Sequence, residues 1–212
     1  MNKKVYGDEL FIYSMALMEE QDNKHMQNIE DGNINEFSEC AVIDITCGQA
    51  RINGDLVFFS ERCIIENKLY MVIPSNFEKV SSHIIKNEIP AEGRPDIIYA
   101  NAKEKVGISF KLREERFRLE ETEKSLNELV QAFQDMNPTY AVNTSVVVDV
   151  EGSRIGYLDF ISTNGSCDLY NQIFILTLDK HLLVGSFSCL FADMNKWIEV
   201  SKQMLHSMKV VC

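Results

Sequence analysis

Most of the sequence after residue 40 consists of short runs in which apolar and polar residues alternate, and this pattern constrains the fold most strongly. Alternation with a period of two is typical of β-strands that bury one face. Turn-forming pairs such as Asn53-Gly54, Glu151-Gly152 and Asp179-Lys180 separate several runs, and such short connections favour antiparallel neighbours. The runs extend over 41–46, 51–59, 62–65, 68–73, 96–100, 106–112, 140–150, 153–162, 169–178 and 181–189. We therefore expect an antiparallel sheet.

Two stretches have instead the 3.6-residue period of amphipathic helices. The first runs from about Phe117 to Met136 and ends before Asn137-Pro138, because the residue before a proline avoids helical angles. The second runs from about Asp193 to Met208, where the Asp193 side chain can cap the first turn. The stripes expected to be buried contain Leu119, Leu126, Leu129, Val130, Phe133 and Met136 in the first helix, and Trp197, Val200, Met204, Leu205 and Met208 in the second.

The order of these elements predicts an α+β protein. Many antiparallel strands, with one helix in mid-chain and one at the end, indicate an α/β/α sandwich whose central twisted antiparallel sheet is flanked by helices. We expect a single sheet. The polar stretch from Ser75 to Arg94, which follows Pro74, is predicted to be a loop with one helical turn.

The first 39 residues are interpreted as a region separate from the domain 40–212. A helix is predicted from Gly7 to about Ile29, and the acidic, turn-rich segment from Glu30 to Glu39 is predicted to be a linker. Residues 40–212 then form one domain, as the length of the chain and its 45% of apolar residues allow. The stripe Met15, Met18 and Met26 either packs in the core or forms an adaptable docking surface.

The charge and hydropathy of the chain argue against two classes of partner. The net charge of −11 disfavours nucleic acid, and the basic stretch from Lys111 to Arg118 also carries Glu114 and Glu115. No run approaches the ~18 apolar residues of a membrane-spanning helix, so no membrane insertion is expected. The first residues lack the apolar centre of a secretory signal, so we expect a cytoplasmic protein with reduced cysteines. These are Cys40, Cys47, Cys63, Cys167, Cys189 and Cys212.

No combination of reactive side chains in the sequence meets the requirements of a catalytic or metal site. Cys167 beside Asp168, with His181 further on, comes nearest to a nucleophile and its base. A strand over 169–178, at ~3.3 Å per residue, would hold Cys167 and His181 about 30 Å apart. The four histidines are scattered, at His25, His83, His181 and His206, and no Cys-x-x-Cys pair or glycine-rich phosphate motif occurs. The sequence therefore predicts no catalytic, cofactor-binding or metal-ligating residue, no cofactor, and a protein that is not an enzyme.

Three segments carry a resemblance to a known superfamily. They are Met71 to Phe77 (MVIPSNF), Arg94 to Asn101 (RPDIIYAN) followed by VGISF, and the ending from Asn171 to Val210, which includes LLVGSFSC and MLHSMKV. These segments resemble the PsbP-like superfamily, which includes the photosystem subunit PsbP, a Ran-GTPase release factor and bacterial DcrB-like proteins. The resemblance covers about residues 68–212. It implies an α/β/α sandwich around an antiparallel sheet and a binding or accessory role without chemistry of its own, and it assigns no functional residue.

The leading functional hypothesis is a non-catalytic binding module, an accessory protein or chaperone-like adaptor that presents a sheet face or groove to another polypeptide. One alternative is a small-molecule binder or an unrecognised enzyme with a pocket between the sheet and the helix from Phe117 to Met136. Another is a homo-oligomer in which the N-terminal helix pairs or swaps. Stabilisation by a ligand would favour the first alternative, and a change in size on removing Met1 to Glu39 would favour the second.

Overall fold

The computed structural model describes residues 44–211, with gaps at 90, 92–93, 137–141 and 165–166. The N-terminal helix and the acidic linker predicted within the first 39 residues lie outside this part and stay predictions. The domain boundary placed at residue 40 is likewise a prediction. Across the described part of the chain, no helix combines the length and the hydrophobicity that a bilayer-spanning segment requires.

The larger of two antiparallel sheets has seven strands in the order β4-β5-β6-β10-β9-β8-β7. Its strands are β4 (Glu78–Lys79), β5 (Ile97–Asn101), β6 (Val106–Arg116), β7 (Val142–Val150), β8 (Ser153–Asn164), β9 (Cys167–Leu178) and β10 (His181–Leu190). The predicted turn at Asp179-Lys180 is confirmed, with φ angles of 50° and 63°. Such positive angles match the twist of a two-residue hairpin. The pairing of β6 with β10 joins the two halves of the described chain, and it sets Ser109 opposite Ser186.

The smaller sheet contains β1 (Gln49–Ile52), β2 (Asp55–Ile65), β3 (Leu69–Pro74) and β11 (Lys209–Val210), in that order. The expectation of a single sheet was therefore wrong. The strand expected over 51–59 is divided by the turn at Asn53-Gly54, whose φ angles of 49° and 88° reverse the chain. The two-residue β11 was not predicted, because its pairing with β3 is a tertiary contact between distant segments.

The strand predicted over 41–46 is also wrong in its described part. Residues Ile45–Cys47 form a 3-10 helix, and the Asp44 carboxylate accepts a hydrogen bond of 2.9 Å from the Thr46 amide. Asp competes in this way with strand hydrogen bonding wherever it can bond a neighbouring amide. Ile45 is fully buried, so the turn anchors the start of the described chain in the core.

The helices are α2 (Ser82–Glu88), α3 (Thr122–Met136) and α4 (Met194–His206). Both predicted amphipathic helices are present, but the first begins five residues late, because β6 continues to Arg116 and a 3-10 helix covers Leu119–Glu121. Leu119 is 39% exposed and does not belong to the buried stripe. Asp193 is at the N-cap of α4, yet its side chain makes no capping hydrogen bond. The polar stretch after Pro74 contains β4 and the seven-residue α2, which is more than one helical turn.

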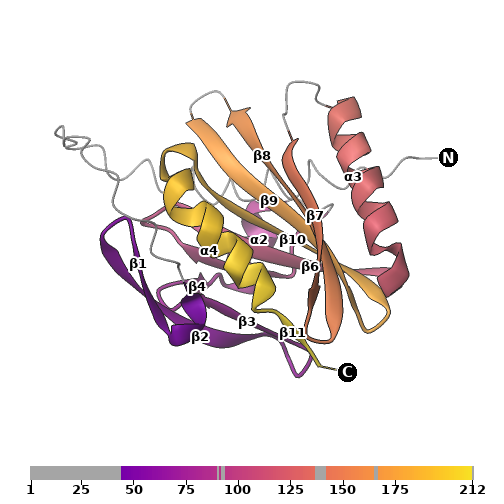
Figure 1. The fold of residues 1–212 in the computed structure, drawn as a ribbon, viewed down its shortest axis with the longest axis horizontal. Helices are drawn as coiled ribbons and strands as arrows, with labels where there is room; N and C mark the ends of the chain where they lie inside the picture. The colour runs from indigo at the N-terminus through magenta and orange to yellow at the C-terminus, as the bar shows by residue number, and fades with distance from the viewer. Residues whose placement is uncertain (1–43, 90, 92–93, 137–141, 165–166, 212) are drawn as a thin grey trace.

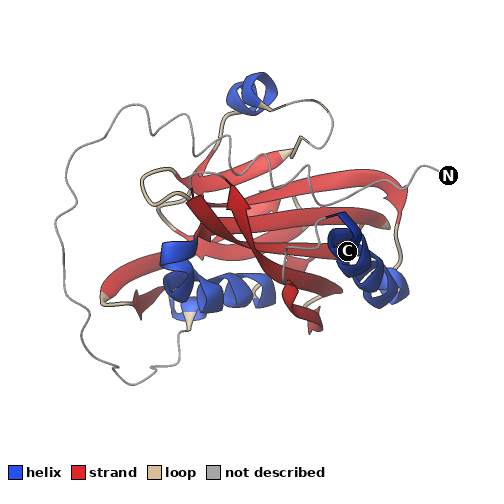
Figure 2. Cartoon of the chain, turned by 90° about the horizontal axis from the view of Figure 1, so that it is seen from above, coloured by secondary structure: helices blue, strands red, loops and turns tan. Residues whose placement is uncertain are grey.

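The elements form three layers with the seven-stranded sheet in the middle (Figures 1 and 2). One face of this sheet packs on α3, through Leu126, Leu129 and Phe133, and on α2 near its β5 edge. The other face packs on a layer that α4 shares with the four-stranded sheet, and the larger core lies there. The fold is therefore α+β, and the predicted α/β/α sandwich is confirmed with an additional small sheet in one outer layer.

Candidate functional site

A narrow slot opens between the first half of α3 and the seven-stranded sheet, and we take it as the candidate functional site. Its volume is about 250 Å³. The floor consists of apolar side chains from the segment after β6, from α3, and from the central strands β9 and β10: Phe117, Leu129, Ile175, Leu182 and Val184. Each of these floor residues is buried. The slot is therefore a hydrophobic recess that the tertiary packing of α3 creates.

The mouth of the slot is acidic. Glu115, Glu121 and Glu128 line it together with a single cation, Arg116, while Ser125 contributes a hydroxyl. Glu121 is held in place at the start of the helical segment, where its carboxylate accepts a hydrogen bond of 2.8 Å from the Arg118 amide. Glu128 forms a long, exposed ion pair of 3.7 Å with Lys124. Three carboxylates against one guanidinium favour a ligand that carries positive charge.

The sheet face that packs against α3 also buries a row of polar side chains, which form hydrogen bonds with one another. Asn171 donates a hydrogen bond of 2.9 Å to Ser162 and accepts one of 2.8 Å from Ser188. Further along, the hydroxyls of Ser109 and Ser186 lie 2.9 Å apart and hydrogen-bond to each other. All five residues are buried, and their mutual bonds offset the cost of removing them from water.

The opposite face buries a second polar group, beneath α4. The Tyr170 hydroxyl donates a hydrogen bond of 3.1 Å to Asp159, and both residues are almost fully buried. Burial, reinforced by the nearby negative charge of Asp159, raises the pKa of Tyr170 well above its usual range. The Tyr170 hydroxyl therefore stays neutral at physiological pH and acts as a hydrogen-bond donor to Asp159.

The structure keeps apart the residues that came nearest to a catalytic pair. Cys167 begins β9 and His181 begins β10, directly opposite Leu178 at the other end of β9. The whole length of the strand separates them, as the sequence predicted. His83, on α2, and His206, at the end of α4, lie on different elements, and His25 lies outside the described residues. Among residues 44–211, outside the gaps, no group of three His, Cys, Asp or Glu side chains could hold a metal ion.

One alternative drawn from the sequence placed a pocket between the sheet and the helix from Phe117 to Met136, where the slot lies, but the sequence identified neither its acidic mouth nor the buried polar group beneath α4. The glutamates near α3 received no role from the sequence, because the slot exists only when α3 lies on β9 and β10. Sequence reasoning also passed over Asp159 and Gln172. The signal for Asp159 was present, since this acidic residue has the same strand parity as Ile155 and Tyr157, which face the core.

Comparisons with known proteins identify the fold alone. No protein-family model matches the sequence, and no curated protein is significantly similar to it. The structure is similar to cyanobacterial PsbP (CyanoP) from Synechocystis sp. PCC 6803, with a TM-score of 0.52, 10% identity, and coverage of 72% of this chain and 92% of that one.

Two further solved structures give lower TM-scores. The Pseudomonas aeruginosa protein PA94, of unknown function, gives a TM-score of 0.40 at 12% identity, covering 70% of this chain and 94% of that one. LpqN of Mycobacterium tuberculosis, which is involved in cell envelope biogenesis, gives 0.45 at 7% identity, covering 74% and 92%. These two scores are too low to carry an argument. The similarity to CyanoP supports a PsbP-like fold, in agreement with the resemblance seen in the sequence.

Proposed function

We propose that this chain, with its PsbP-like fold, is a non-catalytic accessory protein that binds another polypeptide by accepting one of its apolar side chains into the slot beside α3. The observation that carries the proposal is the form of the slot, an apolar floor within an acidic mouth. No reaction is needed to account for this arrangement, because the floor carries no nucleophile and no acid–base group.

The size of the slot favours a side chain over a cofactor. Pockets for drug-sized ligands and cofactors usually enclose about 300–1,000 Å³, whereas this slot has about 250 Å³. Burial of one Leu, Met or Phe side chain contributes roughly 1.5–3 kcal/mol. That contribution corresponds to about a 10- to 100-fold gain in affinity, which suits one anchor within a larger contact surface.

The charge of the mouth selects the partner. We infer that basic residues flank the inserted side chain, because Glu121 and Glu128 are exposed at the rim. The chain's own first 43 residues suit the rim poorly, since 3 lysines and 9 acidic residues give them a net charge of 3 − 9 = −6. A second copy, with its net charge of −11, would likewise be repelled. A basic polypeptide of different sequence is therefore the favoured partner.

A peptide-display selection against the full chain tests this proposal. We expect the selected peptides to combine Lys or Arg with a central Leu, Met or Phe, and their binding to weaken as salt is added. Ser125→Trp, which fills the slot from α3, should reduce their affinity about 10- to 100-fold. Glu128→Lys should weaken binding through charge, whereas the matched control Glu199→Lys, on the exposed side of α4, should not.

Two outcomes would contradict the proposal. Selected peptides that bind equally well to the wild type and to Ser125→Trp would place polypeptide binding elsewhere on the molecule. A screened small molecule that stabilises the wild type but not Ser125→Trp, without any peptide selected, would favour the small-molecule alternative. In that case ligand at 100 times its Kd should stabilise the fold by about 2.7 kcal/mol.

We further propose that the protein works in a reducing compartment such as the cytoplasm. Cys47 and Cys63 are exposed free thiols, and Cys189 is a buried one. Exposed thiols persist in reduced form where glutathione and thioredoxin are present. Fractionation of cells that express the tagged full chain tests this, and recovery in an oxidising compartment would count against it.

A further inference from the structure

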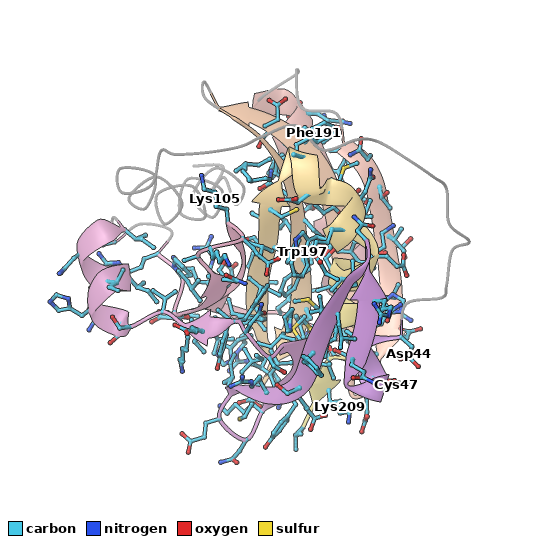
Figure 3. The ribbon with its side chains drawn as sticks, turned by 90° about the vertical axis from the view of Figure 1, so that its left-hand side faces the viewer. Asp44, Cys47, Lys105, Phe191, Trp197 and Lys209 are labelled. Atoms are coloured by element: carbon cyan, nitrogen blue, oxygen red, sulfur yellow. The ribbon has the colours of Figure 1, made fainter. Side chains whose placement is uncertain are left out.

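The polar residues beneath α4 form a group that the proposed function does not use. Asp159 on β8 lies directly opposite Gln172 on β9, which in turn lies directly opposite Phe187 on β10. The Trp197 ring of α4 lies over Phe187, with ring centroids 6.2 Å apart. Figure 3 shows Trp197 near the middle of the molecule, where α4 approaches the sheets. Asp159 and Gln172 are therefore direct cross-strand neighbours, and Trp197 belongs to the same buried layer through its contact with Phe187.

Polar atoms of these three residues lack protein partners although they are buried. Asp159 and Trp197 are each 1% exposed and Gln172 is 0% exposed. Within the described residues, Asp159 Oδ1, Gln172 Oε1, Gln172 Nε2 and Trp197 Nε1 have no hydrogen-bond partner. The other Asp159 oxygen accepts the Tyr170 hydroxyl. A buried polar atom without a hydrogen bond costs about 1–3 kcal/mol, so four of them in one interface require an explanation.

The chemistry of the four atoms selects the ligand. Two are acceptors, on Asp159 and Gln172, and two are donors, on Gln172 and Trp197. A metal cation would leave both donors unsatisfied, and an anion would be repelled by Asp159. Water donates two hydrogen bonds and accepts two, and buried waters usually make about three bonds to otherwise unsatisfied groups. We propose that ordered water bridges Asp159, Gln172 and Trp197 and thereby connects α4 to the central strands.

The single tryptophan makes this proposal directly testable, because the indole N–H of Trp197 gives one unambiguous NMR signal. In the full-length wild type we expect a rotating-frame NOE between this proton and long-lived water. Gln172→Met removes two of the four bonding atoms at nearly constant volume, so it should weaken the cross-peak several-fold or abolish it. The matched control Gln131→Met changes an exposed glutamine of α3 and should leave the cross-peak unchanged.

Each remaining outcome decides the question. Tyr170→Phe should retain the cross-peak, and its loss there would attribute the signal to proton exchange through the tyrosine hydroxyl and overturn the proposal. A resolved Trp197 signal without a water cross-peak, or a cross-peak that persists unchanged in Gln172→Met, would also overturn it. If Gln172→Met fails to fold, a high-resolution crystal structure of the wild type decides. Water within hydrogen-bond distance of Asp159 Oδ1 and Trp197 Nε1 supports the proposal, and direct bonds from those atoms to protein groups refute it.

Discussion

The two faces of the seven-stranded sheet both bury polar side chains, but they satisfy them differently. On the face that α3 partly covers, Asn171 bonds to Ser162 and Ser188, so the polar groups complete one another. On the α4 face, Gln172 is the next residue of the same strand, and its amide has no partner among the described residues. Successive side chains of a strand point to opposite faces, so two adjacent amides have opposite environments.

This difference indicates how the two faces divide structure and function. On the α3 face, Asn171 and its serine neighbours satisfy one another, and the face opens to solvent at the acidic slot, the proposed site of partner binding. The α4 face is filled by large side chains such as Trp197 and Phe187. Its polar atoms without partners among the described residues are buried inside the protein. We infer that the first face is available for recognition, whereas the second holds the layers together.

The largest expected effect comes from breaking the α4 face at Trp197. Its ring contacts Phe77 and Phe187, with centroids 5.9 Å and 6.2 Å away. Trp197→Ala removes these contacts and leaves a cavity, so it should lower the free energy of unfolding by about 3–5 kcal/mol. Denaturant titration measures this. Phe58→Ala is a suitable control, because Phe58 is 56% exposed and should change stability by no more than about 0.5 kcal/mol.

Substitutions of the adjacent residues Asn171 and Gln172 give the sharpest test of the difference between the two faces. Asn171→Leu leaves the hydroxyls of Ser162 and Ser188 without their partner, so it should cost about 1–3 kcal/mol. Gln172→Met breaks only the proposed bonds to water and no bond to a protein group, so it should cost less than Asn171→Leu. Chemical denaturation of both variants measures the difference. Equal losses for the two variants would show that the faces do not differ in the way described.

The smallest expected effect comes from an exposed ion pair on the α3 face, formed by Asp149 of β7 and Arg154 of β8. The Arg154 guanidinium donates a hydrogen bond of 2.7 Å to Asp149 and lowers the pKa of that carboxyl below its usual range. A carboxyl whose pKa is lower in the folded state stabilises the fold at pH values above its unfolded pKa of about 3.9. This stability is lost as the pH falls through the folded pKa.

Arg154→Gln should therefore return the pKa of Asp149 towards its ordinary value and remove this part of the acid dependence. Titration of the carboxyl carbon signal by NMR measures the change. Added salt should produce a similar, partial shift in the wild type, because both groups are exposed. An unchanged pKa in Arg154→Gln would assign the shift to another cause.

The fold class could be predicted because its determinants are local. The alternating runs fixed most strands of the large sheet, the turn at Asp179-Lys180 needed only its own two residues, and the stripe with Leu126, Leu129 and Phe133 identified α3. Each of these signals depends on which side of an element is apolar, and that is written in consecutive residues.

The sequence by itself thus determined most of the strand and helix pattern, the sandwich and the separation of Cys167 from His181. Only the tertiary structure decided the second sheet, the β6–β10 pairing, the acidic slot and the buried polar group beneath α4. Gly185 illustrates the reason, since a Cβ there would lie 2.1 Å from the Phe174 ring on the neighbouring strand. Features of this kind depend on which distant residues meet, and the periodicity of a chain specifies which face is buried but not what buries it.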